Sequence, residues 1–92
     1  MEKINNKISE YIKNDKLDIE KIMEDYNNYI YTIINNFNFK FVEEDKEDII
    51  IDVYLTLWNN QKKLDFNKSL SPYIAGIVKN LVLKKIRKTK RT

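Results

Sequence analysis

The stretch SLSPYIAGIVKNLVLKKIRK, residues 69–88, determines how the rest of the chain is organised. Ser71 followed by Pro72 predicts a helix start, because a serine hydroxyl accepts from first-turn N–H groups and proline suits the first helical position. Apolar residues at helical spacing then form one stripe, and polar or small residues fall on another side. The stripe comprises Ile74, Ile77, Val78, Leu81 and Val82, and the other side comprises Tyr73, Gly76, Asn80, Lys84 and Arg87. The pattern predicts a helix over residues 72–88 that packs one face on a core and directs a polar, cationic face away from it. A basic tail over residues 89–92 is predicted to follow.

Charge is distributed unevenly along the chain. Residues 1–65 carry nine Lys or Arg against fourteen Asp or Glu, a balance of −5, whereas residues 66–92 carry eight Lys or Arg and no acid, a balance of +8. Together they give the net charge of +3. A purely cationic segment attracts polyanions such as nucleic acids. A solvated lysine tail explains residues 88–92 well, but it explains less well why the polar side of the preceding helix also lacks acids.

Length and composition bound the function. With 92 residues, 42% of them hydrophobic, the chain is expected to form a single domain over residues 1–92 with a modest core. The absence of cysteine and histidine removes disulfides, most zinc sites and the commonest general base. Asp48 and Asp52 alone make a poor Mg²⁺ site or acid–base pair. No segment resembles a membrane span or a signal peptide, so we expect a cytoplasmic protein that is not an enzyme and needs no metal or cofactor.

Two helices are predicted upstream. The spacing of Ile4, Ile8, Tyr11 and Ile12 predicts a short amphipathic helix over about residues 3–13, broken at residues 14–16. A helix over residues 19–36 is better marked, because Asp18 is a favourable N-cap and Leu17 and Ile22 form a hydrophobic staple. Its apolar stripe comprises Ile22, Tyr26, Ile30, Ile33 and Phe37, widened by Tyr29 and Ile34.

A further helix is predicted over residues 46–60, with Asp45 and Asp48 as a variant capping box. Its buried face comprises Ile49, Ile50, Val53, Tyr54 and Leu57. Ile51, Leu55 and Trp58 lie off this stripe, so either the first helix or a partner protein covers them, and Trp58 is expected in the core. Residues 36–45 carry three phenylalanines and are predicted to form a loop that caps the core; a short strand over FNFKF is the alternative.

Residues 59–69, NNQKKLDFNKS, predict a loop of about ten residues, longer than most helix–helix connections. Long ordered loops often carry function, and a plain surface connector is the equally weighted alternative. Together these segments predict an all-α fold, a compact bundle of three to four helices with no sheet.

Two blocks of the sequence resemble region 2 of the extracytoplasmic-function sigma factors of bacterial RNA polymerase. DIIIDVYLTLW at 48–58 is similar to the family's acidic helix D-L-V-Q-E-V-F-L-x-L-W, and residues 69–88 are similar to S-F-x-x-W-L-x-x-I-A-R-N-x-x-x-D-x-x-R. The matching positions are Asp48, Asp52, Val53, Tyr54, Leu55, Leu57 and Trp58 in the first block, and Ser69, Leu70, Tyr73, Ile74, Ile77, Lys79, Asn80 and Arg87 in the second. A loop containing LDF (64–66) joins them, and the resemblance covers residues 20–90.

The resemblance implies a transcription initiation factor domain with two binding surfaces, working in the bacterial cytoplasm at the nucleoid. The acidic helix docks on the clamp helices of the β′ subunit of RNA polymerase, and the candidates for this contact are Asp48, Ile51, Asp52 and Leu55. The basic helix and the preceding loop recognise the promoter's minus-ten element and hold its non-template strand open, with a pocket for a flipped base at about residues 60–69. The candidate DNA-binding residues are Lys62, Lys63, Phe66, Lys68, Tyr73, Lys79, Asn80, Lys84, Arg87 and Lys88. Lys85, Lys90 and Arg91 extend this cationic track, and an anti-sigma factor is a further candidate partner.

Alternatives remain open at several positions. Tyr73 is equally well explained as a core aromatic, and Asn80 as a buried asparagine that holds the loop. The sequence also departs from the family pattern, since Ile51 replaces glutamine, Lys84 replaces aspartate, and a complete factor continues into a domain that recognises the minus-thirty-five element. The alternative functions are a generic helix-turn-helix module, which fits the long loop poorly, and a protein-interaction module with an incidental basic tail.

Overall fold

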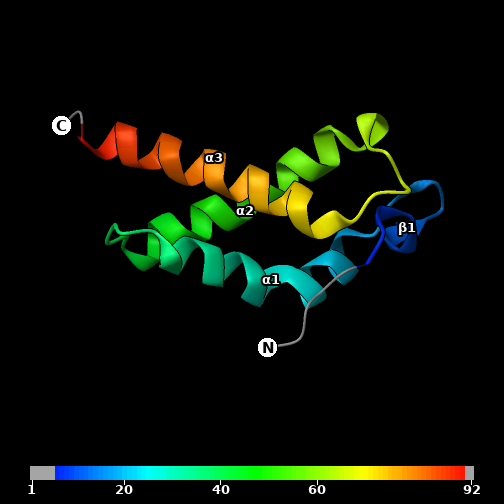
Figure 1. Cartoon of the computed structure of the whole chain (residues 1–92), viewed down its shortest axis with the longest axis horizontal. Coiled ribbons are helices and arrows are strands. Elements are labelled where there is room, and N and C mark those ends of the chain that lie inside the picture. Colours follow the sequence, from blue (N-terminus) through cyan, green and yellow to red (C-terminus); the bar gives the residue numbers. More distant parts are fainter. Residues whose placement is uncertain (1–5, 91–92) are drawn as a thin grey trace.

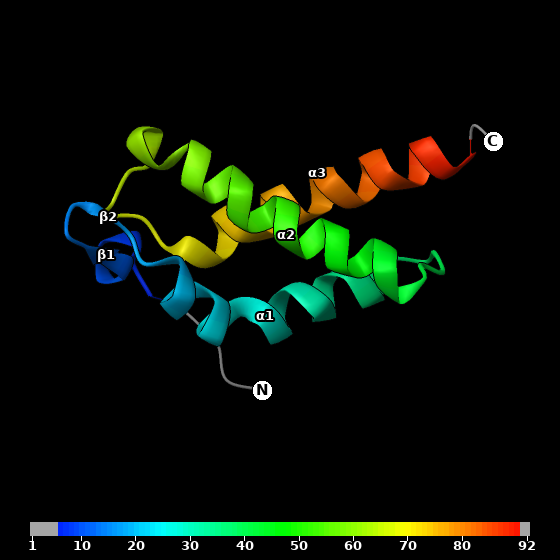
Figure 2. The ribbon, with the colours of Figure 1, turned by 180° about the vertical axis from the view of Figure 1, so that it is seen from behind.

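Three long helices make up most of the computed structural model, which describes residues 6–90 and the side chains of residues 6–89. These are α1 (Ile19–Asn36), α2 (Glu43–Asn59) and α3 (Leu70–Lys90). Each packs on the other two, with α2 behind α1 and α3 in Figure 1 and in front of them in the reverse view of Figure 2. The predicted bundle is therefore confirmed for the described part of the chain, apart from a small hairpin. Within that part, no helix is both long and apolar enough to cross a bilayer.

The core lies between the three helices and follows the predicted stripes. α1 begins as predicted, with the Asp18 carboxylate accepting a hydrogen bond from the backbone N–H of Lys21 at 3.3 Å. Leu17 and Ile22, the predicted staple, are both buried. In α3 the stripe is narrower than predicted, because Ile77 and Leu81 are only partly buried. The fully buried side chains of the three helices are Ile22, Tyr26, Ile30, Ile34, Val53, Leu57, Leu70, Ile74, Val78 and Val82.

The N-terminal helix predicted over residues 3–13 is wrong for the residues that the structure describes; residues 3–5 lie outside them. One 3-10 turn, η1 (Ile8–Tyr11), leads into strands β1 (Ile12–Lys13) and β2 (Lys16–Leu17), which pair antiparallel, so the prediction of no sheet is also corrected. Asn14 and Asp15 form the turn with φ of 52° and 64°, a conformation that Asn and Asp tolerate and that two-residue hairpins require. Ile8 and Tyr11 are buried, but a spacing of three needs only a single turn.

Helices α2 and α3 both begin earlier than predicted. α2 starts at Glu43 after Val42, which makes no side-chain cap, and Asp45 lies in the first turn rather than at the cap. Three acids in that turn favour the helix through its dipole. α3 starts at Leu70, so Pro72 is its third residue, where the backbone N–H is not needed for intrahelical bonding.

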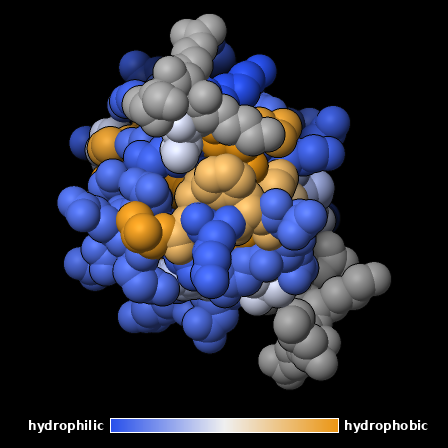
Figure 3. All heavy atoms as spheres, turned by 90° about the vertical axis from the view of Figure 1, so that its left-hand side faces the viewer, coloured by the Kyte–Doolittle hydropathy of each residue, from blue (hydrophilic) through white to orange (hydrophobic). Residues whose placement is uncertain are grey.

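The connector between α1 and α2 is a loop that covers one end of the core, as predicted. Phe41 is 8% exposed, and its ring lies 4.7 Å from that of Phe39, centroid to centroid. Phe37 and Phe39 are partly buried against the core. Figure 3 views this end of the molecule and shows apolar side chains gathered there within a hydrophilic surround. The aromatic residues thus close the core at the end away from the α2–α3 loop (Figure 1).

Candidate nucleic-acid interface

The exposed face of α3 carries the predicted polar and cationic residues. Asn80, Lys84 and Arg87 are all exposed, and spacings of four and three place them on one side of the helix. They lie there because Ile74, Val78 and Val82 occupy the opposite side in the core. The alternative that Asn80 is a buried asparagine is therefore wrong.

Two more cationic side chains lie on either side of this face, and a third, Lys85, points away from it. Lys79 and Lys88 are exposed about 100° and 80° to either side of Asn80 by helical geometry. Lys85 turns instead toward α2, where its ammonium lies 3.4 Å from the Asp48 carboxylate and 3.7 Å from that of Asp45. The expectation that Lys85 belongs to the cationic track is corrected, while the side chains of Lys90 and Arg91 lie outside the described residues.

A hollow of about 600 Å³ opens where the α2–α3 loop meets the start of α3. The loop spans residues 60–69 and includes a 3-10 turn, η2 (Gln61–Lys63). Asp65 stabilises the turn that follows, because its carboxylate accepts from the N–H of Asn67 at 3.1 Å and its carbonyl from the N–H of Lys68 at 3.0 Å. The lining residues are Ile8, Lys63, Leu64, Asp65, Lys68, Ser69, Pro72 and Tyr73. This volume lies within the range of about 300–1,000 Å³ typical of sites that enclose small molecules.

The second predicted surface lies on α2. Asp48, Ile51, Asp52 and Leu55 are all exposed, and Ile51 and Leu55 remain 57% and 53% exposed. Trp58 continues this stripe at 41% exposed, so its predicted place in the core is wrong. Trp58 also lines a shallow hollow with residues of the hairpin and the start of α1, while Ile51 and Leu55 form an apolar stripe bordered by carboxylates. Such a stripe is typical of a surface that contacts another protein.

A comparison with protein families adds to this geometry. The family model of sigma-70 region 2 matches residues 22–92, most of the chain. The chain belongs to the sigma-70 region 2 family. Domains of this family are non-catalytic parts of transcription initiation factors, which bind RNA polymerase and recognise the promoter's minus-ten element. No curated protein and no solved structure was found to match the chain.

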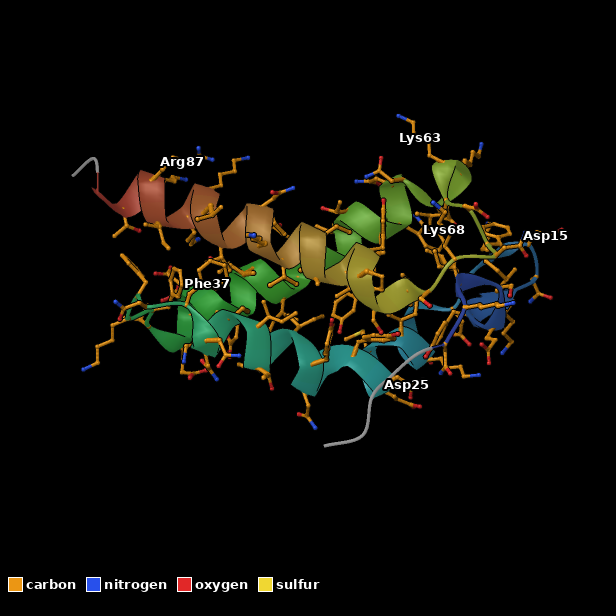
Figure 4. The ribbon with its side chains drawn as sticks, in the orientation of Figure 1. Asp15, Asp25, Phe37, Lys63, Lys68 and Arg87 are labelled. Carbon is orange, nitrogen blue, oxygen red and sulfur yellow. The ribbon has the colours of Figure 1, made fainter. Side chains whose placement is uncertain are left out.

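The structure brings together only some of the loop residues expected to bind DNA in this sigma-70 region 2 domain. Lys63 and Lys68 line the hollow. Tyr73 lines it too and packs against the core, so its core contact is confirmed and its contact with DNA stays a prediction. Lys62 and Phe66 are exposed beside the hollow without lining it. In the view of Figure 4, Lys63 and Arg87 lie along the same upper edge of the molecule.

Five residues that line the hollow of this sigma domain were not among the candidate DNA-binding residues, namely Ile8, Leu64, Asp65, Ser69 and Pro72. Leu64 and Asp65 belong to the LDF segment that the family resemblance singled out, so that segment could have indicated them. Ile8 lies more than fifty residues away along the chain and outside the matched region, and no local pattern links it to the loop.

Burial shifts the titration of three tyrosines of the sigma domain. It raises the pKa of Tyr54 to about 12 and also raises those of Tyr11 and Tyr26. None of these groups titrates near neutral pH. Among the described residues, no cluster of carboxylates is arranged to hold a metal ion.

Proposed function

We propose that this domain is of the extracytoplasmic-function type and holds the non-template strand of the minus-ten element unpaired while docked on the β′ clamp helices of RNA polymerase. The observation that carries the proposal is that the exposed face of α3 and the hollow adjoin one another. The acid-free exposed face of α3 runs into the hollow at its N-terminal end, and Tyr73 belongs to both. A strand lying along α3 therefore has a place for one extruded base.

On this proposal, phosphates and bases contact different residues. Lys84 and Arg87, flanked by Lys79 and Lys88, receive the phosphates of the strand. The Tyr73 ring provides a stacking surface for a base, and the Asn80 amide pairs with a base edge. Lys63 and Lys68 lie at the hollow and neutralise the phosphates next to the extruded base. Opening the promoter in this way forms and breaks no covalent bond.

The α2 stripe supplies the polymerase contact. Ile51 and Leu55 are more than half exposed, and burying the remainder of each side chain contributes about 1 kcal/mol. Ile51 in place of the family's glutamine makes this contact more apolar. Asp48 and Asp52 attract cationic residues of the clamp, and Asp48 then exchanges its partner Lys85 for one on the polymerase. An anti-sigma factor that covered the same stripe would block docking.

Charge reversal tests the polymerase contact. The chain and its Asp52→Lys variant are titrated with a purified fragment of the β′ clamp helices, and Glu24→Lys on the exposed side of α1 is the matched control. We expect Asp52→Lys to weaken binding at least tenfold and Glu24→Lys to leave it unchanged. Equal affinity of all three proteins would exclude α2 as the docking face.

Strand preference tests the DNA contact. The isolated domain is titrated at low salt with single-stranded and duplex oligonucleotides of the same minus-ten sequence. We expect weak, salt-sensitive binding that favours the single strand. A preference for duplex would instead support the helix-turn-helix alternative, and no binding to either would leave the protein-interaction alternative.

A further inference from the structure

The N-terminal segment 6–18 is hydrogen-bonded to the α2–α3 loop, although it lies outside the residues matched to the family. The backbone N–H groups of Ile8 and Ser9 donate to the carbonyls of Lys68 and Phe66, both at 2.9 Å. In the other direction, the N–H of Leu70 donates to the carbonyl of Asn6 at 3.0 Å. Two of the residues joined in this way, Ile8 and Lys68, line the hollow. We call residues 6–18 the clasp. Both ribbon views show the clasp and the loop at the same end of the molecule (Figures 1 and 2).

The clasp is itself anchored to the helices. Tyr11 is 1% exposed, donates its hydroxyl proton to Asp25 of α1 at 2.8 Å and packs edge-on against Tyr26. At the other end, the N–H of Leu17 donates to the side-chain oxygen of Gln61 in η2 at 3.0 Å. The loop is thus fixed at both of its ends by a segment that is fixed to the core.

Ile8 connects the clasp to the hollow. Ile8 is 2% exposed and is the most deeply buried of the apolar residues that line the hollow, the others being Leu64 and Pro72. The lining also carries the charged residues Lys63, Asp65 and Lys68. We infer that the clasp is part of the site that holds the extruded base, with Ile8 as the floor of that site and the backbone hydrogen bonds as the device that keeps the loop in its binding conformation. This inference depends on the proposed function, because it concerns the same hollow.

The physical advantage is preorganisation. A ten-residue loop that ordered only on binding would lose binding free energy for every side chain immobilised. A loop already hydrogen-bonded to a buried segment avoids much of that cost. An apolar floor also discriminates between a strand that carries a base at this position and one that does not, since only the base buries it. Ile8 is therefore a residue that contacts the base, and its effect is specific to one nucleotide.

The test uses the 92-residue chain and single-stranded minus-ten oligonucleotides. 2-Aminopurine is placed at each position in turn, and its fluorescence identifies the base that leaves the stack. Affinities are then measured for a strand with that base and for a strand with an abasic site in its place. For the unmodified chain we expect the abasic strand to bind about tenfold more weakly, in keeping with one stacked base.

Ile8→Ala and Leu17→Ala are compared by one ratio, the affinity for the strand that carries the base divided by the affinity for the abasic strand. Both residues are almost fully buried in the clasp, but Leu17 does not line the hollow, so both variants lose core packing and only Ile8→Ala removes the floor. We expect the abasic effect to shrink at least threefold in Ile8→Ala and to persist in Leu17→Ala. Should Ile8→Ala not fold, Ile8→Val removes one methyl group and decides the question by the same ratio.

The two ways of failing are distinct. An abasic effect as large in the Ile8 variants as in Leu17→Ala would reduce the clasp to a structural element and overturn the inference, while leaving the proposed function in place. An unmodified chain that binds the strand but shows no abasic effect at any position would remove the base site itself, and with it both the inference and that part of the proposed function.

Discussion

At the scale of single residues, Tyr54 couples the stability of the fold to alkaline pH. It is 7% exposed, its hydroxyl donates to Asn27 of α1, and burial raises its pKa from 10.0 to about 12. The raised pKa means that the folded protein keeps this proton more strongly than the unfolded chain does. The resulting stability is present in full below pH 10 and is lost as the pH rises from 10 to 12.

We therefore expect the free energy of unfolding to fall between pH 10 and 12, by up to about 1.4 kcal/mol per pH unit for each buried tyrosine. Urea unfolding at a series of pH values measures this slope, and Tyr54→Phe, which lacks the ionisable group, should show a shallower one. A slope in Tyr54→Phe as steep as that of the unmodified chain would assign the effect to Tyr11 and Tyr26 alone.

Lys84 and Lys85 are adjacent in sequence and differ in what they contact. A step of about 100° sends Lys84 to the exposed face and Lys85 to the carboxylates of α2. We expect Lys85→Ala to lower stability by no more than about 1 kcal/mol, as for partly exposed ion pairs, and to affect strand binding little. Lys84→Ala should weaken strand binding and change stability little. Thermal unfolding and strand titrations of the two variants would contradict the assignment if both lost binding equally.

At the scale of elements, the N-terminus of α1 is set by one side chain. Because the Asp18 carboxylate accepts from the N–H of Lys21, Asp18→Ala should cost about 1 kcal/mol and lower the melting temperature by about 4–8 °C, whereas Asp18→Asn keeps the cap. Thermal unfolding followed by circular dichroism measures both. Equal melting temperatures for Asp18→Ala and the unmodified chain would show that the cap contributes little here.

Substitutions in the α2 stripe are expected to change polymerase binding without changing the stability of the fold. Ile51 and Leu55 are more than half exposed, so Ile51→Ser with Leu55→Ser should change stability by only about 0.5 kcal/mol per site. Because these side chains form the proposed contact, the same double variant should bind the β′ clamp helices at least tenfold more weakly. Unchanged binding by a variant that stays folded would contradict the proposed docking face.

Elements were predictable where local signals agreed. For α1 the cap, the staple and the apolar stripe all point to the same start, and its bounds were predicted as the structure has them. The N-terminal segment failed because the spacing of Ile8 and Tyr11 fits both a helix and a single turn, and the hairpin turn of Asn14 and Asp15 has no glycine to mark it. Trp58 lies next to the buried stripe in sequence, which predicts burial, but it remains 41% exposed at a hollow that it shares with the hairpin and the start of α1.

At the scale of the whole molecule, the DNA-facing side of α3 was predictable and the hollow only partly so. The face follows from periodicity within one helix, since Asn80, Lys84 and Arg87 share a side whatever lies elsewhere. The hollow is lined in part by Ile8, which backbone hydrogen bonds between residues 6–9 and 66–70 hold beside the loop, and contacts at such a separation leave no pattern in a single sequence. Ile8 could therefore not have been assigned without the structure.

The central claim is that the exposed face of α3 follows the phosphates of an unpaired strand. Its most direct test is the salt dependence of single-strand binding by the unmodified chain, by Lys84→Ala with Arg87→Ala, and by Lys40→Ala with Lys46→Ala, which removes the same charge from the α1–α2 connector and α2. Each phosphate contact contributes about 0.7 to the slope of log affinity against log salt, so the α3 variant should lose about 1.4 while the control keeps its slope. A slope that stays the same in the α3 variant, or falls equally in the control, would contradict the claim.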